Sequence, residues 1–198
     1  SKAIVNRSPV ARKTVTKLRY ATQFDLNPTA GAAAVHVFSA NGMYDPDWTG
    51  TGHQPRGFDQ LMALYDHYVV LGAKIQIHFD NTGNTGAAQI GISLKDSTTV
   101  SGDIEDYMEE GQLVQRYASP SGASQNTLSM QVNPNKFLGR SKPLADSQLK
   151  GSASGNPAEQ AYFQVFASDT DGLTNLNAIH CTATIDFICA LIEPKQPT

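Results

Sequence analysis

The side chains that could hold a metal ion or move a proton are scattered along this chain rather than grouped. The five histidines are His36, His53, His67, His78 and His180. No two of them fall at the close spacing that is typical of zinc sites. Asp45 and Asp47 could offer carboxylate oxygens to a calcium ion, but Asp45 is explained more simply as the cap of the turn that Pro46 imposes. The sequence therefore predicts no metal site.

Nucleophilic and cofactor chemistry has no local motif either. The chain contains no Gly-x-Ser-x-Gly elbow, no Cys–His pairing and neither of the glycine patterns that bind phosphate. A cupin-type metal enzyme would need two histidines one residue apart, whereas His36 and His78 each stand alone, and we expect both to face solvent or another subunit. We predict that the protein is not an enzyme, with no catalytic residue and no cofactor.

The two cysteines, Cys181 and Cys189, lie eight residues apart in one expected strand. At about 3.3 Å per residue their Cα atoms would be roughly 26 Å apart, too far for a disulfide bond. We expect both to be buried thiols among apolar neighbours.

Charge is distributed very unevenly along the chain. The formal net charge of -3 combines a basic beginning with an acidic remainder, since residues 1–19 contain six basic residues and no acidic one. The six are Lys2, Arg7, Arg12, Lys13, Lys17 and Arg19. A segment with so few large apolar side chains cannot bury enough surface to offset the entropy of ordering, but its cations gain from neutralising phosphates. We predict that these six residues bind nucleic acid.

Alternation of apolar and polar residues is the dominant pattern, and it predicts strands rather than helices. The expected strands are 14–26, 33–40, 68–80, 88–95, 112–118, 127–133, 160–168 and 177–192. In 14–26, Lys17 and Arg19 fall on the polar face, opposite Leu18 and Tyr20. In the strand 68–80 one face is expected to contain Val69, Leu71, Ala73, Ile75, Ile77 and Phe79.

Two short segments interrupt this pattern, and helical spacing predicts helices at 58–65 and 103–109. Eight strands with long connections favour an all-β fold, a single antiparallel jelly roll of two packed four-stranded sheets. We expect a basic N-terminal arm at 1–13, shortened because the sequence begins at Ser1, then a jelly-roll domain at 14–193 and a tail at 194–198. No stretch reaches the length of a membrane span, so no membrane insertion is expected.

Several stretches resemble the capsid proteins of small circular single-stranded DNA viruses that encode a replication initiator, the circovirus-like group. They are the run from His53 to Gln60 (HQPRGFDQ), the run from Tyr65 to Ile75 (YDHYVVLGAKI) and the run from Asn133 to Gly139 (NPNKFLG). The first is similar to a Pro-Arg-Gly-Phe-Asp-like stretch of that group, and the second to its Tyr-x-x-Tyr and Gly-x-Lys-Ile strand entry. The order of elements extends the resemblance over most of the chain.

The resemblance implies a protein that assembles with copies of itself into an icosahedral shell. It also implies that the basic arm lies inside with single-stranded DNA, that the protein is located in the virion, and that it enters the host nucleus during assembly. It indicates no particular host-cell receptor. We expect the connections 41–57, 96–111, 134–159 and 169–176 to form the outer surface and the contacts between subunits.

The residues expected at subunit interfaces are Trp48, Arg56, Phe58 and Tyr65. Two other interpretations remain open from the sequence. One is a lectin-like, carbohydrate-binding jelly-roll module, and the other is the capsid protein of a small RNA virus, which has the same fold.

Overall fold

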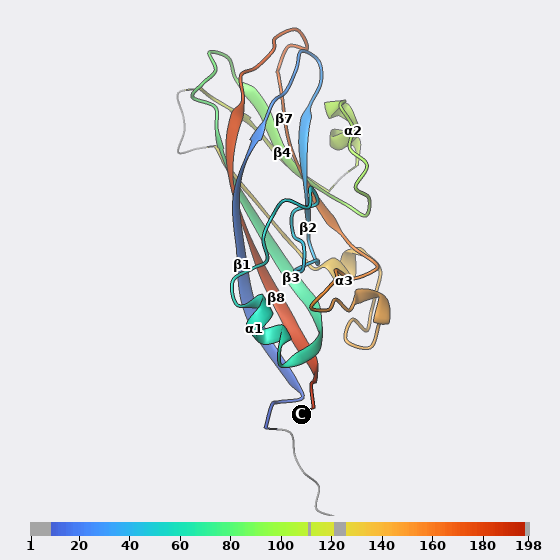
Figure 1. Ribbon diagram of the computed structural model, residues 1–198. Coiled ribbons are helices and arrows are strands. Elements are labelled where there is room, and N and C mark those ends of the chain that lie inside the picture. Colours follow the sequence, from blue (N-terminus) through green and yellow to red (C-terminus); the bar gives the residue numbers. More distant parts are fainter. Residues whose placement is uncertain (1–8, 111, 121–125, 197–198) are drawn as a thin grey trace, which may run out of the picture.

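The structure, a computed structural model, describes residues 9–110, 112–120 and 126–196, and in them the chain forms two packed β-sheets (Figure 1). The first sheet has the order β1 (Lys13–Leu26), β8 (Ile179–Pro194), β3 (Tyr65–Asp80), β6 (Thr127–Val132). The second has the order β2 (Ala34–Ser39), β7 (Tyr162–Ser168), β4 (Ala88–Lys95), β5 (Leu113–Ala118). All neighbouring strands are antiparallel. The predicted fold class, a jelly roll of two four-stranded sheets, is confirmed.

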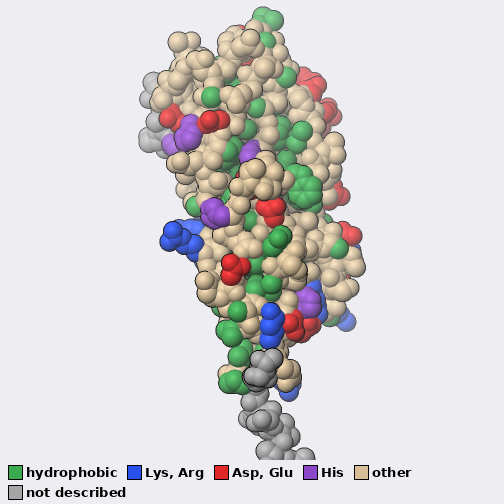
Figure 2. Space-filling view, viewed as in Figure 1, with side chains coloured by type: hydrophobic (Ala, Val, Ile, Leu, Met, Phe, Trp, Pro, Cys, Tyr) green, Lys and Arg blue, Asp and Glu red, His purple; other side chains and the backbone are tan. Residues whose placement is uncertain are grey.

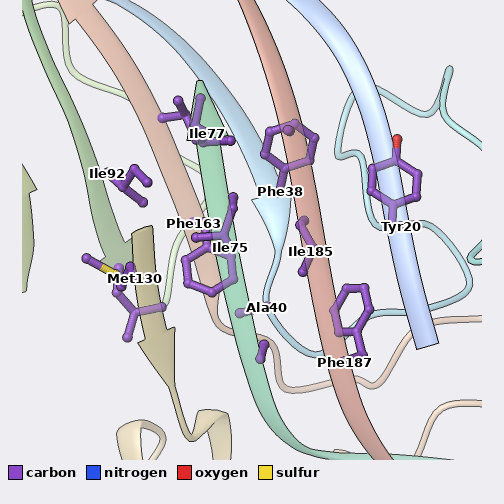
Figure 3. Close-up of a cluster of buried hydrophobic side chains, with 14 of the residues drawn as sticks. Tyr20, Phe38, Ala40, Ile75, Ile77, Ile92, Met130, Phe163, Ile185 and Phe187 are labelled. Atoms are coloured by element: carbon purple, nitrogen blue, oxygen red, sulfur yellow. The ribbon is translucent and has the colours of Figure 1, made fainter. Parts of the chain in front are cut away.

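The long strands β1 and β8 form the longest uninterrupted pairing, from Lys13 opposite Ile192 to Leu26 opposite Ile179. In β8, apolar residues recur at every second position from Ile179 to Leu191. Leu18, Tyr20, Phe24 and Leu26 of β1 lie on the same face of the ribbon, together with three threonines. That face packs against the second sheet. Figure 3 shows the result, with Tyr20 of β1, Ile185 of β8 and Phe163 of β7 directed into one shared core. The alternation in the sequence therefore places Lys17 and Arg19 on the outer face.

Strand β3 departs from the predicted alternation at one point. Its register against β8 shifts between Val70 and Gly72, where a β-bulge adds one residue. An added residue reverses which side the following side chains face. Ala73 and the apolar residues after it point into the core as predicted, but Val69 and Leu71 pack in a second apolar cluster with Leu149, Ala190 and Ile192. The prediction that all six apolar residues share one face was wrong for these two.

Both predicted helices exist, and the first is shorter than expected. Helix α1 (Phe58–Met62) follows Gly57, whose φ of 87° is accessible to glycine at little cost. It ends before Tyr65, which already belongs to β3. Helix α2 (Ile104–Glu109) begins at Asp103, whose side chain accepts a hydrogen bond from the N–H of Glu105.

Helix α2 covers the outer face of the second sheet, beside β4 and β7 (Figure 1). Its Tyr107 stacks on Phe166 of β7 with the ring centres 4.7 Å apart. The Phe166 ring lies directly over Gly91 of β4, where a Cβ atom would come within 2.2 Å of it. This covering accounts for the burial of Phe166 on the outer face of β7, a strand that is buried on both faces.

Two further short helices lie in the long connection before β7. They are α3 (Pro134–Phe137), capped by the side chain of Asn133, and the 3-10 turn η2 (Ser147–Leu149). Among the described residues, no helix combines the length and the apolar character that crossing a membrane requires.

Candidate nucleic-acid and subunit interface

The predicted basic residues divide into three groups in the structure. Lys2 and Arg7 lie outside the described residues. Arg12 and Lys13 are exposed where β1 begins, and Lys17 and Arg19 follow on the outer face of that strand. The outward orientation of the last two, predicted from the alternation, is what the structure shows.

Lys17 and Arg19 share one acidic partner on β8. The Nε and Nη2 atoms of Arg19 donate to the two carboxylate oxygens of Asp186 at 2.6 and 2.9 Å, and the Nζ of Lys17 lies 2.7 Å from the same group. The hydrogen bond from Arg19 is the main cause that lowers the pKa of Asp186 to about 2, helped by Lys17 and opposed by partial desolvation. Two cations on one anion leave this part of the sheet with net positive charge.

A third cation continues this row across the sheet. Asp186 lies between Arg19 of β1 and Lys74 of β3 in the strand register, and Gln131 of β6 lies next to Lys74. Cross-strand partners share a face, so Lys74 is also on the outer surface. Lys74 was assigned to the polar side of its strand by the sequence but was not among the predicted binding residues. The signal that could have found it is its place opposite Asp186, which needs the register.

The other end of the same outer face is acidic. The Nδ1 atom of His180 lies 2.7 Å from Asp25, and Asp80 follows on β3 opposite His180. Hydrogen bonds from the hydroxyl and N–H of Thr82 lower the pKa of Asp80. On the face seen in Figure 2, Lys and Arg side chains lie in the lower half of the molecule, toward the end where β1 begins.

A hollow of about 600 Å³ adjoins the free edge of β1. It is lined by Lys17, Leu18, Arg19, Ala21, His53 and Arg56. His53 fastens the segment before α1 to the strand, since its Nε2 lies 3.0 Å from the carbonyl oxygen of Ala21 and its Nδ1 lies 2.8 Å from that of Gln54. A larger depression of about 770 Å³ shares His53 and Arg56 with this hollow and is also lined by Asp45 and Asp59.

The four predicted interface residues have different environments. Trp48 is 49% exposed and makes a T-shaped ring contact with Tyr162, and Arg56 is exposed. Phe58 and Tyr65 are 1% and 3% exposed, so their side chains belong to the core of the protomer and are not available on its surface. This core role explains why Phe58 and Tyr65 are apolar and why they recur at helical spacing in the sequence.

His36 and Asp47 interact with each other. His36, expected to face solvent or another subunit, is mostly buried between Phe24 and Phe38, and its Nε2 lies 3.0 Å from Asp47. Burial acts to raise the pKa of Asp47, but hydrogen bonds from His36 and Thr49 outweigh it and lower the pKa. Asp47, one of the two carboxylates considered as calcium ligands, thus already accepts hydrogen bonds from protein donors. No group of three or more metal-binding side chains is present in the described ranges.

The cysteines are buried and unpaired, as predicted. Burial raises the pKa of the Cys189 thiol to about 12, and it also raises that of Cys181. Neither thiol is poised for nucleophilic chemistry, because the reactive form is the thiolate.

Comparison with known proteins gives similarity at the level of the fold. No family model matches the chain, and no curated protein matches it. Solved structures do match over nearly the whole length. That of the mud crab tombus-like virus has a TM-score of 0.55 at 12% identity, covering 98% of this chain and 96% of the other. The semi-empty virus-like particle of the giant freshwater prawn nodavirus gives 0.54 at 10% identity, covering 98% and 100%.

A third match is the BFDV capsid protein, described as decameric, with a TM-score of 0.50 at 12% identity and coverage of 93% and 100%. The three are a virus, a virus-like particle and a viral capsid protein. At such low identity the likeness shows a common jelly-roll fold, the same one that the strand order establishes.

Proposed function

We propose that this protein is a viral capsid protein, which assembles with copies of itself into an icosahedral shell and packages a single-stranded DNA genome. The observation that best supports this is that one chain combines a two-sheet body with a cationic segment that leads into its edge strand. Viral structures with the same fold along their whole length support the capsid role. In this proposal residues 1–13 are the arm, 14–193 the shell domain and 194–198 a tail.

The subunit contacts of the shell are proposed to form at the long connections. Trp48 supports this, since a half-exposed tryptophan is a typical anchor of protein interfaces. In an icosahedral shell the contacts around three-fold and five-fold axes join different surfaces of neighbouring copies and are heterologous. Such contacts close into a shell when the rotation between copies closes.

The nucleic acid is proposed to bind by charge rather than by sequence. Arg12, Lys13, Lys17 and Arg19 lie in one exposed series along the start of β1, and Lys2 and Arg7 precede them in the sequence. Counterion release by such cations gives affinity that falls steeply with salt and differs little between sequences. The protein would then be located in the virion, and in the host nucleus during assembly.

Assembly and cargo can be tested together on purified protein. Electron microscopy and light scattering are expected to show closed particles, and nuclease treatment is expected to leave a protected nucleic acid inside. DNase and RNase digestion of the released cargo then identifies the genome type, and protected RNA alone would replace single-stranded DNA by the RNA-virus alternative. A chain that stays monomeric at all salt and pH values tested would contradict the capsid proposal.

The charge of the arm has its own test. Replacing Lys2, Arg7, Arg12 and Lys13 by Gln is expected to reduce the packaged nucleic acid per particle while particles still form. The lectin-like alternative predicts instead specific binding of the monomer to glycans, measured on a glycan array, with no effect of these four substitutions.

A further inference from the structure

We propose that the hollow beside the free edge of β1 is a binding site for the phosphodiester groups of single-stranded nucleic acid, formed by Lys17, Arg19, His53 and Arg56. This site, the basic hollow, would extend the binding surface from the arm onto the folded body. The inference rests on the proposed function and deepens it, because it assigns Arg56 to cargo binding rather than to subunit contact.

The lining of the basic hollow is unusual in charge. Every titratable side chain that lines it is basic, namely Lys17, Arg19, His53 and Arg56. The neighbouring Asp186 neutralises one charge, through its contacts with Lys17 and Arg19. Arg56 is exposed and has no ion pair among the described residues, so its guanidinium is available for a ligand. The site therefore has an excess of positive charge and fork-shaped donors that suit phosphate oxygens.

The backbone of β1 adds uncharged donors to the same place. β1 pairs only with β8, so its other edge is open. The carbonyl group of Ala21 points to this open edge, where it meets His53 at 3.0 Å. Backbone groups two residues apart in an antiparallel strand point the same way. The N–H groups of Lys17 and Arg19 therefore also face the open edge, where an anion in the hollow can accept from them.

His53 determines where Arg56 lies relative to Arg19. Its ring packs on Tyr20 with the centres 4.9 Å apart, and its two nitrogens reach carbonyl oxygens of β1 and of its own segment. The segment that contains Arg56 is thus held at the strand edge independently of any ligand, which makes the basic hollow a preformed site.

Continuity with the arm favours nucleic acid over an isolated anion as the occupant. Lys13, Lys17 and Arg19 lie on one face of β1 over about 20 Å, given roughly 3.3 Å per residue. Arg56 continues this series across the hollow. A polyanion with regularly repeated charges can contact all four cations at once, whereas a single carboxylate or phosphate contacts one or two.

The test uses the full-length chain and a fluorescent oligo-dT of about 20 nucleotides, with binding followed by anisotropy over a range of salt concentrations. The key variant is Arg56→Gln. Its matched control is Lys142→Gln, which removes one exposed positive charge from the connection before η2. Loss of one phosphate contact predicts a three- to tenfold weaker affinity for Arg56→Gln near 0.1 M salt. It also predicts a salt slope shallower by about one unit. The control should change neither, and Arg56→Lys should retain most of the affinity.

Each alternative gives a distinct result. Equal affinity of Arg56→Gln and Lys142→Gln, with wild-type protein binding the oligonucleotide well, would overturn the basic hollow and leave the proposed function intact. If Arg56→Gln bound the oligonucleotide as well as wild type but no longer formed particles in the electron microscope, the basic hollow would also be overturned. The hollow would then be a contact site for an acidic segment of a second copy. No binding by wild-type protein at any salt concentration would overturn the proposed packaging role itself.

Discussion

Arg19 and Asp186 form a two-contact ion pair across the junction of the first and last strands, with Nε and Nη2 of the arginine at 2.6 and 2.9 Å from the two carboxylate oxygens. The pair fixes the direction of the guanidinium on an exposed surface. The same carboxylate also contacts Lys17, so one acid partly neutralises two cations of the outer face.

The ion pair makes stability sensitive to acid. The pKa of Asp186 is lowered to about 2 in the folded protein, below the ordinary 3.8. A carboxylate with a lowered folded pKa stabilises the protein above its unfolded pKa, and this contribution disappears as the pH falls from about 4 to about 2. We expect the melting temperature of Asp186→Asn to fall less over this interval than that of wild-type protein. Parallel curves of melting temperature against pH would contradict this.

Removing the same acid should strengthen binding to nucleic acid at neutral pH. In Asp186→Asn, Lys17 and Arg19 lose their shared anion, so both charges become available to phosphates. We expect oligo-dT affinity to rise a few-fold, with a steeper salt dependence. Glu105→Gln, which removes an exposed acid from α2 on the other sheet, is the control. The same increase in both variants would show that only total charge matters.

The contact between Gly91 and Phe166 predicts a strong effect of one methyl group. A Cβ atom on Gly91 would come within 2.2 Å of the Phe166 ring, which is held from its other side by Tyr107. Gly91→Ala should lower the free energy of unfolding in urea by about 1–3 kcal/mol, as overpacking does. Gly86→Ala, where nothing lies within 4 Å, should change it by less than about 0.5 kcal/mol. Equal effects of the two substitutions would refute the steric explanation.

A buried hydroxyl of β3 holds the start of the 41–57 connection. The Oη of Tyr68 accepts from the N–H groups of Met43 and Tyr44 at 3.0 and 3.3 Å, and burial raises the pKa of this phenol. Tyr68→Phe leaves the buried N–H of Met43 without its acceptor, so we expect a loss of about 1–3 kcal/mol in urea unfolding. Tyr117→Phe, at a site 67% exposed, should leave stability unchanged within about 0.5 kcal/mol. A Tyr68→Phe protein as stable as wild type would show that water replaces the hydroxyl.

The strands could be predicted from the sequence because each follows a local rule. Leu18, Tyr20 and Ile185 alternate with polar residues, and such a pattern has only one buried side. The bulge at Val70 has no comparable local signal, since it depends on how β3 aligns with β8. Residues such as Val69 were therefore assigned to the wrong face although the strand itself was predicted.

The candidate site could be predicted only in part for the same reason. Lys17 and Arg19 were predicted because they lie in a segment rich in basic residues. Arg56 is distant from them in sequence and lines the hollow because the fold brings its segment, through contacts such as that of His53 with Ala21, to the edge of β1. Phe58 packs against Tyr68 of β3, and the hydroxyl of Tyr65 bonds to Thr14 of β1. These contacts depend on the fold, and an apolar side chain in a sequence looks the same whether it is buried in a core or against a partner.

The pairing of Lys13 with Ile192 brings the start of β1 and the end of β8 to the same pole of the molecule (Figure 1). A peptide fused after the last strand will therefore compete for space with whatever precedes the first. The opposite pole offers a better place for an inserted epitope, at the turn that contains Leu173, which is 83% exposed. Engineered display on this scaffold should use that turn and leave both chain ends unmodified.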